Sequence, residues 1–183
     1  MVKISEYFRK MRGTTRGSPP RVSNAEIIWS WIGAFLGIAT VAWVDQFFFT
    51  GTDLSLMIGS FGASAVLVYG AVRSPLAQPR NLVGGHILSA IVGVACWKLF
   101  HQYPWLAQAM AVATAIALMH ATRTLHPPGG ATALIAVIGS AGIHKLGFLY
   151  VLIPATVGPL ILLAVGVVVN NIPESRRYPE IWF

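Results

Sequence analysis

Long apolar stretches separated by short polar ones set the pattern of this chain. Five runs of about 18 or more mainly apolar residues cover positions 26–49, 54–72, 83–100, 105–122 and 147–170. Runs of this length predict membrane-spanning helices. A sixth run, 129–142, would reach only about 21 Å as a helix, whereas the hydrocarbon core of a bilayer is about 30 Å thick. We therefore expect this segment to start within the membrane or to re-enter it.

The composition supports a membrane environment. Of the 183 residues, 55% are hydrophobic and only 10% are charged, against about 25% charged in an ordinary soluble domain. A protein surrounded by lipid needs polar residues mainly at its two ends, whereas a soluble domain needs them over its whole surface. We expect an all-α membrane protein with about six transmembrane helices, of which the second and fifth are short or broken. The single cysteine, Cys96, excludes an internal disulfide.

The basic residues predict the orientation. With six crossings and a cytoplasmic N-terminus, eleven of the thirteen Lys and Arg residues fall on the cytoplasmic side, and only Lys98 and Lys145 fall outside. This distribution indicates membrane topology and contact with anionic lipid, and it argues against a nucleic-acid partner. The expected parts are a basic cytoplasmic arm (1–25), a transmembrane domain (26–170) and a cytoplasmic tail (171–183).

Two segments of the chain resemble each other. "GSFGASAVLVYGA" at 59–71 aligns with "PPGGATALIAVIG" at 127–139, at an offset of 68 residues. The domain then divides into halves of about 26–101 and 102–170. Three spans in each half would insert the second half upside down relative to the first. Such inverted repeats are common in transporters, whose substrate site lies near the midplane between the halves.

The start of the short sixth run has the composition of an anion site. Pro127 and Pro128 suit the first turn of a helix, and Gly129 and Gly130 leave the backbone uncovered. We expect several unpaired N–H groups there, carrying a partial positive charge. The alternative is that the Pro-Gly entry only ends a loop and allows close helix packing.

The repeat mate adds hydroxyl groups to this prediction. Ser60, Gly62 and Ser64 lie at the other glycine-loosened helix start, and Thr132 lies one turn into the short run. If the two helices enter from opposite faces, their N-termini converge on one point near the midplane. The serine and threonine hydroxyls would then donate hydrogen bonds to a small anion.

Four further polar residues complete the candidate site. His86 and His126 could serve as donors or proton carriers on the anion path, or could instead bond to carbonyls and fix the packing. Arg80 and Asn81, at the cytoplasmic edge, could attract an anion. The alternatives for Arg80 are binding a lipid phosphate or simply anchoring the chain at the interface.

The same residues carry a resemblance to a known family. "LHPPGGATALIAVIG" (125–139), "GSFGASAVLVYGA" and "PLAQPRNLVGGHILSAIVG" (75–93) resemble the HPP family of integral membrane proteins over residues 26 to 170, with the His-Pro-Pro motif at 126–128. Similar members in cyanobacteria and chloroplasts are implicated in nitrite transport, and many bacterial members have no assigned substrate. The resemblance implies nitrite as substrate. The family is usually described with four spans, whereas the count here is six.

The expected function is a transporter or channel for a small monovalent anion, in a bacterial inner (plasma) membrane. The alternative is a membrane scaffold or sensor module without transport activity. An enzyme is not expected, because no nucleophile with a base and no metal site with carboxylate support is found. His86, His120 and His126 lack such support, so neither a metal nor a cofactor is predicted. The small size favours a homo-oligomer.

Overall fold

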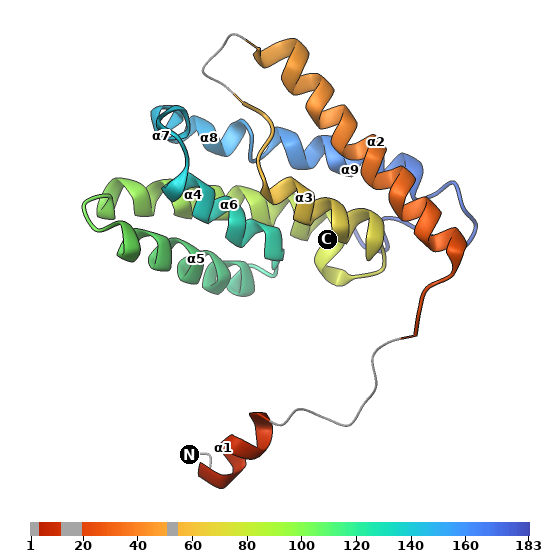
Figure 1. Cartoon of the computed structure of the whole chain (residues 1–183), viewed down its shortest axis with the longest axis horizontal. Helices are drawn as coiled ribbons and strands as arrows, with labels where there is room; N and C mark the ends of the chain where they lie inside the picture. The colour runs from red at the N-terminus through yellow and green to blue at the C-terminus, as the bar shows by residue number, and fades with distance from the viewer. Residues whose placement is uncertain (1–3, 12–19, 51–54) are drawn as a thin grey trace.

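The computed structural model describes residues 4–11, 20–50 and 55–183. The helices are α1 (Ile4–Met11), α2 (Asn24–Phe49), α3 (Ser60–Ala65), the π-helix η1 (Val66–Gly70), the 3-10 helix η2 (Pro75–Ala77), α4 (Pro79–Phe100), α5 (Pro104–Ala121), α6 (Pro127–Ile138), α7 (Ala141–Leu146), α8 (Leu149–Leu152) and α9 (Val157–Val169) (Figure 1). Lys3, Arg12, Arg16 and Asp53 lie outside the described residues, and so do parts of the predicted basic arm and the first residue of the 54–72 run.

Helices form where the apolar runs predict them. The described residues contain no strand, which confirms the all-α class. Four helical stretches are long and apolar enough to cross a membrane: α2, α4, α5 and the α8–α9 stretch, Leu149–Val169. The 54–72 run and the short 129–142 run form shorter apolar helices, Ser60–Gly70 and Pro127–Ile138, as expected from the sequence. Six complete crossings and the inverted repeat stay predictions.

The apolar run 147–170 was predicted as one continuous stretch, but the structure divides it into α8 and α9. The helix breaks between Leu152 and Val157. Pro154 lies in this break, and a proline interrupts a helix because it has no N–H and crowds the preceding turn. The repeat mate predicted for this run, α4, is a single helix of 22 residues. The two halves are therefore not identical in their third element.

The two short helices begin near the middle of the molecule and run in opposite directions (Figure 1). Extended segments, 55–58 and 124–126, lead to their first turns. At α6 the cause is local, because the residue before a proline is pushed out of the helical region. His126 accordingly has φ −137° and ψ 105°. The non-helical segments before α3 and α6 thus allow both helices to begin in the protein interior.

Close helix contacts depend on glycine at particular positions. A Cβ on Gly93 of α4 would lie 2.5 Å from the carbonyl oxygen of Ala133 in α6. A Cβ on Gly37 of α2 would overlap the hydroxyl of Tyr69, which donates to the carbonyl of Leu162 at 2.9 Å. These contacts hold α6 against α4, and α2 against η1 and α9, as small residues do in membrane proteins.

The C-terminal tail returns to the start of α2. The buried guanidinium of Arg176 pairs with Glu26 at 2.7 Å and donates to Ser30 Oγ at 2.9 Å and Asn170 Oδ1 at 3.1 Å. The first turn of α2 and the segment after α9 therefore lie at the same end of the molecule. An even number of membrane crossings between the two segments would place both on the same side of the membrane.

Candidate functional site

A buried polar network lies where α3 and α6 meet. Ser64 Oγ of α3 is 2.8 Å from Nε2 of His86 and 2.9 Å from Nε2 of His126. The other ring nitrogen of His86, Nδ1, is 2.7 Å from Thr132 Oγ1, which is 2.9 Å from Ser60 Oγ. All five side chains are at most 1% exposed. The structure thus brings together Ser60, Ser64, His86, His126 and Thr132, which the sequence predicted as one site.

Glycine at position 85 explains how His126 reaches this centre. A Cβ on Gly85 of α4 would lie 2.6 Å from the Cβ of His126 and 2.9 Å from the carbonyl oxygen of Thr124. Only a residue without a side chain allows the extended segment before α6 to pass this close. The Gly-His pair at 85–86 therefore both admits His126 and supplies its partner imidazole.

His86 bridges two hydroxyls at equivalent positions of the sequence repeat. Ser64 and Thr132 are 68 residues apart, and they contact the two opposite nitrogens of the same ring. Each hydroxyl also lies near the carbonyl oxygen four residues earlier, at 3.2 Å from Ser60 O and 3.3 Å from Pro128 O. The two hydroxyls thus have matching local contacts, and the repeat itself stays a prediction.

The network is filled by its own side chains. No buried side-chain nitrogen or oxygen within the described ranges lacks a hydrogen-bond partner. A ligand would therefore have to replace bonds that the five residues make with one another. The residues have the predicted proximity, and their contact with a substrate stays a prediction.

The expectation of several unpaired amides at α6 does not hold. Pro127 and Pro128 have no N–H, and the N–H of Gly129 donates to the carbonyl of His126 at 2.8 Å. The first four N–H groups of a helix usually have no partner within the helix. In α6 two of these four are missing, and a third already forms a hydrogen bond. Side chains, rather than main-chain amides, are the polar groups that α6 brings to the centre.

Three of the predicted residues point elsewhere. Gly62 is exposed and faces a groove between α3 and α2. Gly130 faces an apolar groove between α5 and α6, where a Cβ would meet only Val112, at 3.9 Å. Pro127 is exposed in the same groove. Gly129, by contrast, is packed against α4, since a Cβ there would lie 2.7 Å from Ser89 Oγ.

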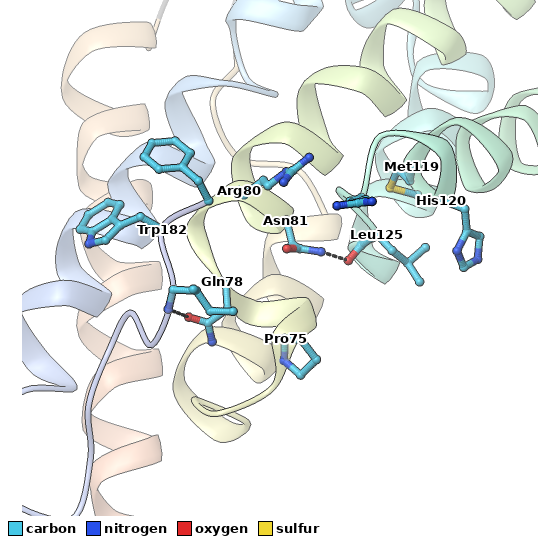
Figure 2. A pocket seen from close by; sticks show the side chains of 11 residues that line it. Pro75, Gln78, Arg80, Asn81, Met119, His120, Leu125 and Trp182 are labelled. Carbon is cyan, nitrogen blue, oxygen red and sulfur yellow. Dashed lines mark hydrogen bonds between the residues drawn. The ribbon is translucent and has the colours of Figure 1, made fainter.

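Arg80 and Asn81 line a basic cavity of about 360 Å³ where α4 begins and α5 ends (Figure 2). Arg80 Nη2 donates to Thr122 O at 2.8 Å, and Asn81 Nδ2 donates to Leu125 O at 2.8 Å. We call this cavity the vestibule. Its lining residues are Pro75, Gln78, Arg80, Asn81, Met119, His120, Arg123, Leu125, Ile181, Trp182 and Phe183.

The vestibule contains residues that the sequence did not indicate as site residues. Arg123 adds a second guanidinium, His120 an imidazole, and the lining has no carboxylate side chain. The tail reaches it because Tyr178, whose hydroxyl donates to Ala77 O at 2.7 Å, is buried. Burial raises the pKa of Tyr178 above its ordinary value. The basic cluster Arg80, His120 and Arg123 is spread over 44 positions, so its assembly depends on the fold.

The histidines do not gather into a group of metal ligands in the described part of the chain. Among the described residues, no three His, Cys, Asp or Glu side chains lie close enough to hold a metal ion. His86 and His126 lie together, with ring centroids 5.1 Å apart, while His120 lines the vestibule. The network consists of two imidazoles and three hydroxyls. Its chemistry is hydrogen bonding and proton exchange.

These features define a multi-pass, all-helical membrane protein with an uncharged polar network at the junction of two short helices. The HPP, transmembrane region family matches residues 19–179, and the chain belongs to this family. Its four long helices agree in number with the four spans usually described for the family, and the two short helices account for the larger count made from the sequence.

Two curated relatives come from Dictyostelium discoideum, and each is described only as a transmembrane protein. One is 44% identical over 97% of this chain and 58% of its own length, and the other is 42% identical over 98% and 64%. The chain thus spans about three fifths of the length of the relatives it matches. No solved structure matches it.

Proposed function

We propose that the protein is a transporter or channel that carries a small monovalent anion, nitrite, across the membrane. The observation that carries the proposal is the buried network of Ser60, Ser64, His86, His126 and Thr132. Polar side chains are costly to bury in the interior of a membrane protein. A cluster of five of them therefore suggests a functional site. Nitrite is suggested by the resemblance to members implicated in nitrite transport.

The charges around the network favour an anion over a cation. Cation sites in membranes normally use carboxylates. In the described part of the chain the carboxylates have other positions: Glu26 pairs with Arg176, and Asp45 accepts a hydrogen bond from the N–H of Leu56. The vestibule adds two guanidinium groups on the side where an anion would approach.

The route we propose leads from the vestibule to the network. Leu125, which lines the vestibule, is followed directly by His126. Pro75, also in the lining, is followed by Leu76, whose carbonyl oxygen is 2.8 Å from His126 Nδ1. We therefore propose His126 as the network residue that an anion from the vestibule reaches first. Because the network side chains bond to one another, entry of an anion requires α3 and α6 to separate enough for the Ser64 bonds to be replaced.

The location and assembly belong to the same proposal. We place the start of α2 and the C-terminal tail on the cytoplasmic side of a bacterial plasma membrane, since the basic residues concentrate there. We propose a homo-oligomer that needs no cofactor and has no catalytic activity, with the anion and membrane lipids as its partners. The match to the HPP family supports the multi-pass membrane setting.

Anion uptake into proteoliposomes tests this function. Protein-containing vesicles should accumulate nitrite faster than empty vesicles, which correct for leak of the protonated acid. Thr132→Val keeps the side-chain shape but removes the hydroxyl that contacts His86, so uptake should fall at least tenfold. Ser89→Ala is the matched control. Ser89 is buried next to the network but bonds only weakly to Met119 Sδ, at 3.6 Å.

A second candidate is a membrane scaffold or sensor module. The observation in its favour is that the network groups are all satisfied by one another, as in a purely structural polar core. Folded protein that moves neither nitrite, nitrate, formate nor chloride would establish this candidate and remove the transport proposal. Uptake that is unchanged in Thr132→Val would instead show that the anion path avoids the network.

A further inference from the structure

We propose that the network takes up one proton together with the anion, so that transport is a one-to-one proton–anion symport. This inference rests on the proposed function and adds the coupling ion and the residues that hold it. Five contacts link Ser60, Thr132, His86, Ser64, His126 and the carbonyl of Leu76 in this order, and the hydroxyls of Ser64 and Thr132 each have one longer contact besides, with Ser60 O and Pro128 O. The inference follows from counting the hydrogens available to this sequence.

The carbonyl of Leu76 fixes the arrangement of the neutral network. A carbonyl only accepts, so Nδ1 of His126, 2.8 Å away, carries a hydrogen. In a neutral ring Nε2 then accepts, and the hydroxyl of Ser64 donates to it at 2.9 Å in preference to the carbonyl oxygen of Ser60, which is 3.2 Å away. Ser64 has one hydrogen, so Nε2 of His86 must donate to Ser64 Oγ. In this neutral form the hydroxyl of Thr132 donates to Nδ1 of His86 and gives up its bond to Ser60 Oγ, to which it is the donor in the structure.

The same heavy-atom positions accommodate one additional proton. If a proton binds to Nδ1 of His86, that ring donates at both nitrogens. Thr132 then accepts from His86 and turns its own hydrogen to Ser60 Oγ, 2.9 Å away. Only the hydroxyls of Thr132 and Ser60 rotate, which costs little. The network therefore has a neutral and a singly protonated form that differ in no heavy-atom contact.

The proton can pass between the two rings through Ser64. The hydrogen on Nε2 of His86 moves to Ser64 Oγ while the hydrogen of Ser64 moves to Nε2 of His126. One N–H and one O–H bond break, and one of each forms. The charge then resides on His126, next to the vestibule. A second proton is opposed by repulsion, because the ring centroids are only 5.1 Å apart.

Among the residues that the structure describes, no carboxylate side chain forms a hydrogen bond or ion pair with the network. Around His86 the facing groups are His126, the hydroxyls of Ser64 and Thr132, and the ring of Phe61 at 5.5 Å. The remaining titratable group in contact is Tyr150 of α8, which donates to Thr132 O at 3.0 Å. A charge isolated in this way is costly, and a bound monovalent anion neutralises it. Proton and anion therefore each favour binding of the other, as symport requires.

Imidazole nitrogen NMR tests the hydrogen count without any transport assay. In protein labelled with ¹⁵N-histidine and reconstituted in nanodiscs at alkaline pH, His126 should carry its hydrogen on Nδ1 and His86 on Nε2. On acidification the pair should take up one proton before a second. The assignment uses His86→Gln and His126→Gln. Opposite tautomers, or two rings that titrate independently, would overturn the inference.

Paired flux measurements test the coupling itself. In vesicles containing a trapped pH dye, inward nitrate gradients should drive one proton per anion, because nitrate has no appreciable protonated form that leaks. Ser64→Ala removes the hydroxyl between the two imidazoles and should lower this ratio at least fivefold or abolish both fluxes together. Ser89→Ala should keep the ratio at one. The same ratio is measured with nitrite after subtraction of empty vesicles.

The outcomes separate this inference from the proposed function. Anion flux in the natural protein with no accompanying protons overturns the symport and leaves anion transport standing. Anion flux in Ser64→Ala with the ratio still at one overturns the role of Ser64 as relay. Absence of flux for every anion tested removes both proposals. A one-to-one ratio that depends on Ser64, together with the expected tautomers, establishes the inference.

Discussion

The contact between α4 and α6 can be tested with two glycines, one tightly packed in the contact (Gly93) and one facing open space (Gly130). Gly93→Ala places a Cβ 2.5 Å from Ala133 O, 2.9 Å from Ala133 Cα and 2.8 Å from Ala136 Cβ. Two of these three atoms belong to the backbone, so no side-chain rotation relieves the overlap. Gly130→Ala, by contrast, places a Cβ no closer than 3.9 Å to Val112.

The magnitudes follow from these distances. Non-bonded carbon atoms settle at about 3.5 Å or more, so α4 and α6 must move apart by about 1 Å in Gly93→Ala. Overpacking of this kind costs about 1–3 kcal/mol, partly offset by about 0.5–1 kcal/mol from replacing glycine in a helix. We expect Gly93→Ala to lower the free energy of unfolding by about 1–2 kcal/mol. Gly130→Ala should leave it unchanged or raise it by up to about 1 kcal/mol.

The assay is reversible unfolding in mixed micelles with increasing SDS, followed by tryptophan fluorescence. Trp97 lies on α4 and reports on the element that is displaced. The two variants should differ by about 1–3 kcal/mol, with Gly93→Ala the less stable. Equal stability of the two variants would show that α6 does not lie against α4 at this distance. The packing of the network, which depends on the same contact, would then need revision.

Other predictions concern the tail, the vestibule, the core and the topology. Arg176→Met should lower the free energy of unfolding by about 2–3 kcal/mol, because Glu26 and Asn170 lose a buried charged partner, whereas exposed Arg177→Met should change it little. Arg80→Gln should raise the KM for anion uptake several-fold at low salt and less at high salt, with kcat unchanged, and Arg73→Gln, outside the vestibule lining, should not. Tyr69→Phe should cost about 1 kcal/mol in the same unfolding assay, through loss of the bond to Leu162 O. In a Cys96→Ala background, a membrane-impermeant thiol reagent should label Gln102→Cys in intact cells and Ser175→Cys only after permeabilisation; the reverse pattern would refute the orientation.

The positions of the helices could be predicted because membrane spans depend on length and apolarity alone. The 68-residue offset also predicted that the hydroxyls of Ser60, Ser64 and Thr132 gather at one place, and in the structure His86 lies between Ser64 and Thr132. The break at residues 153–156 follows from Pro154 and was within reach of the sequence. The shortage of main-chain N–H groups at the start of α6 could also have been predicted, since two successive prolines remove two donors.

The remaining features depend on tertiary contacts without a sequence signature. Which face of a helix points inward is hard to predict when the whole circumference is apolar, so Gly62 and Gly130 were assigned to the wrong side. The tautomer of His126 depends on a main-chain carbonyl, that of Leu76, and any residue supplies one. The vestibule joins Arg80 to Arg123 and the tail, and such assembly appears only once the chain is folded.

The bonds of Arg176 have a consequence for biosynthesis. The opening turns of the first long helix are fastened by a guanidinium that lies 150 residues later in the chain. A ribosome must therefore synthesise the chain as far as residue 176 before the Glu26 end of that helix can form these bonds. The start of α2 reaches its final arrangement only after α9 has been made.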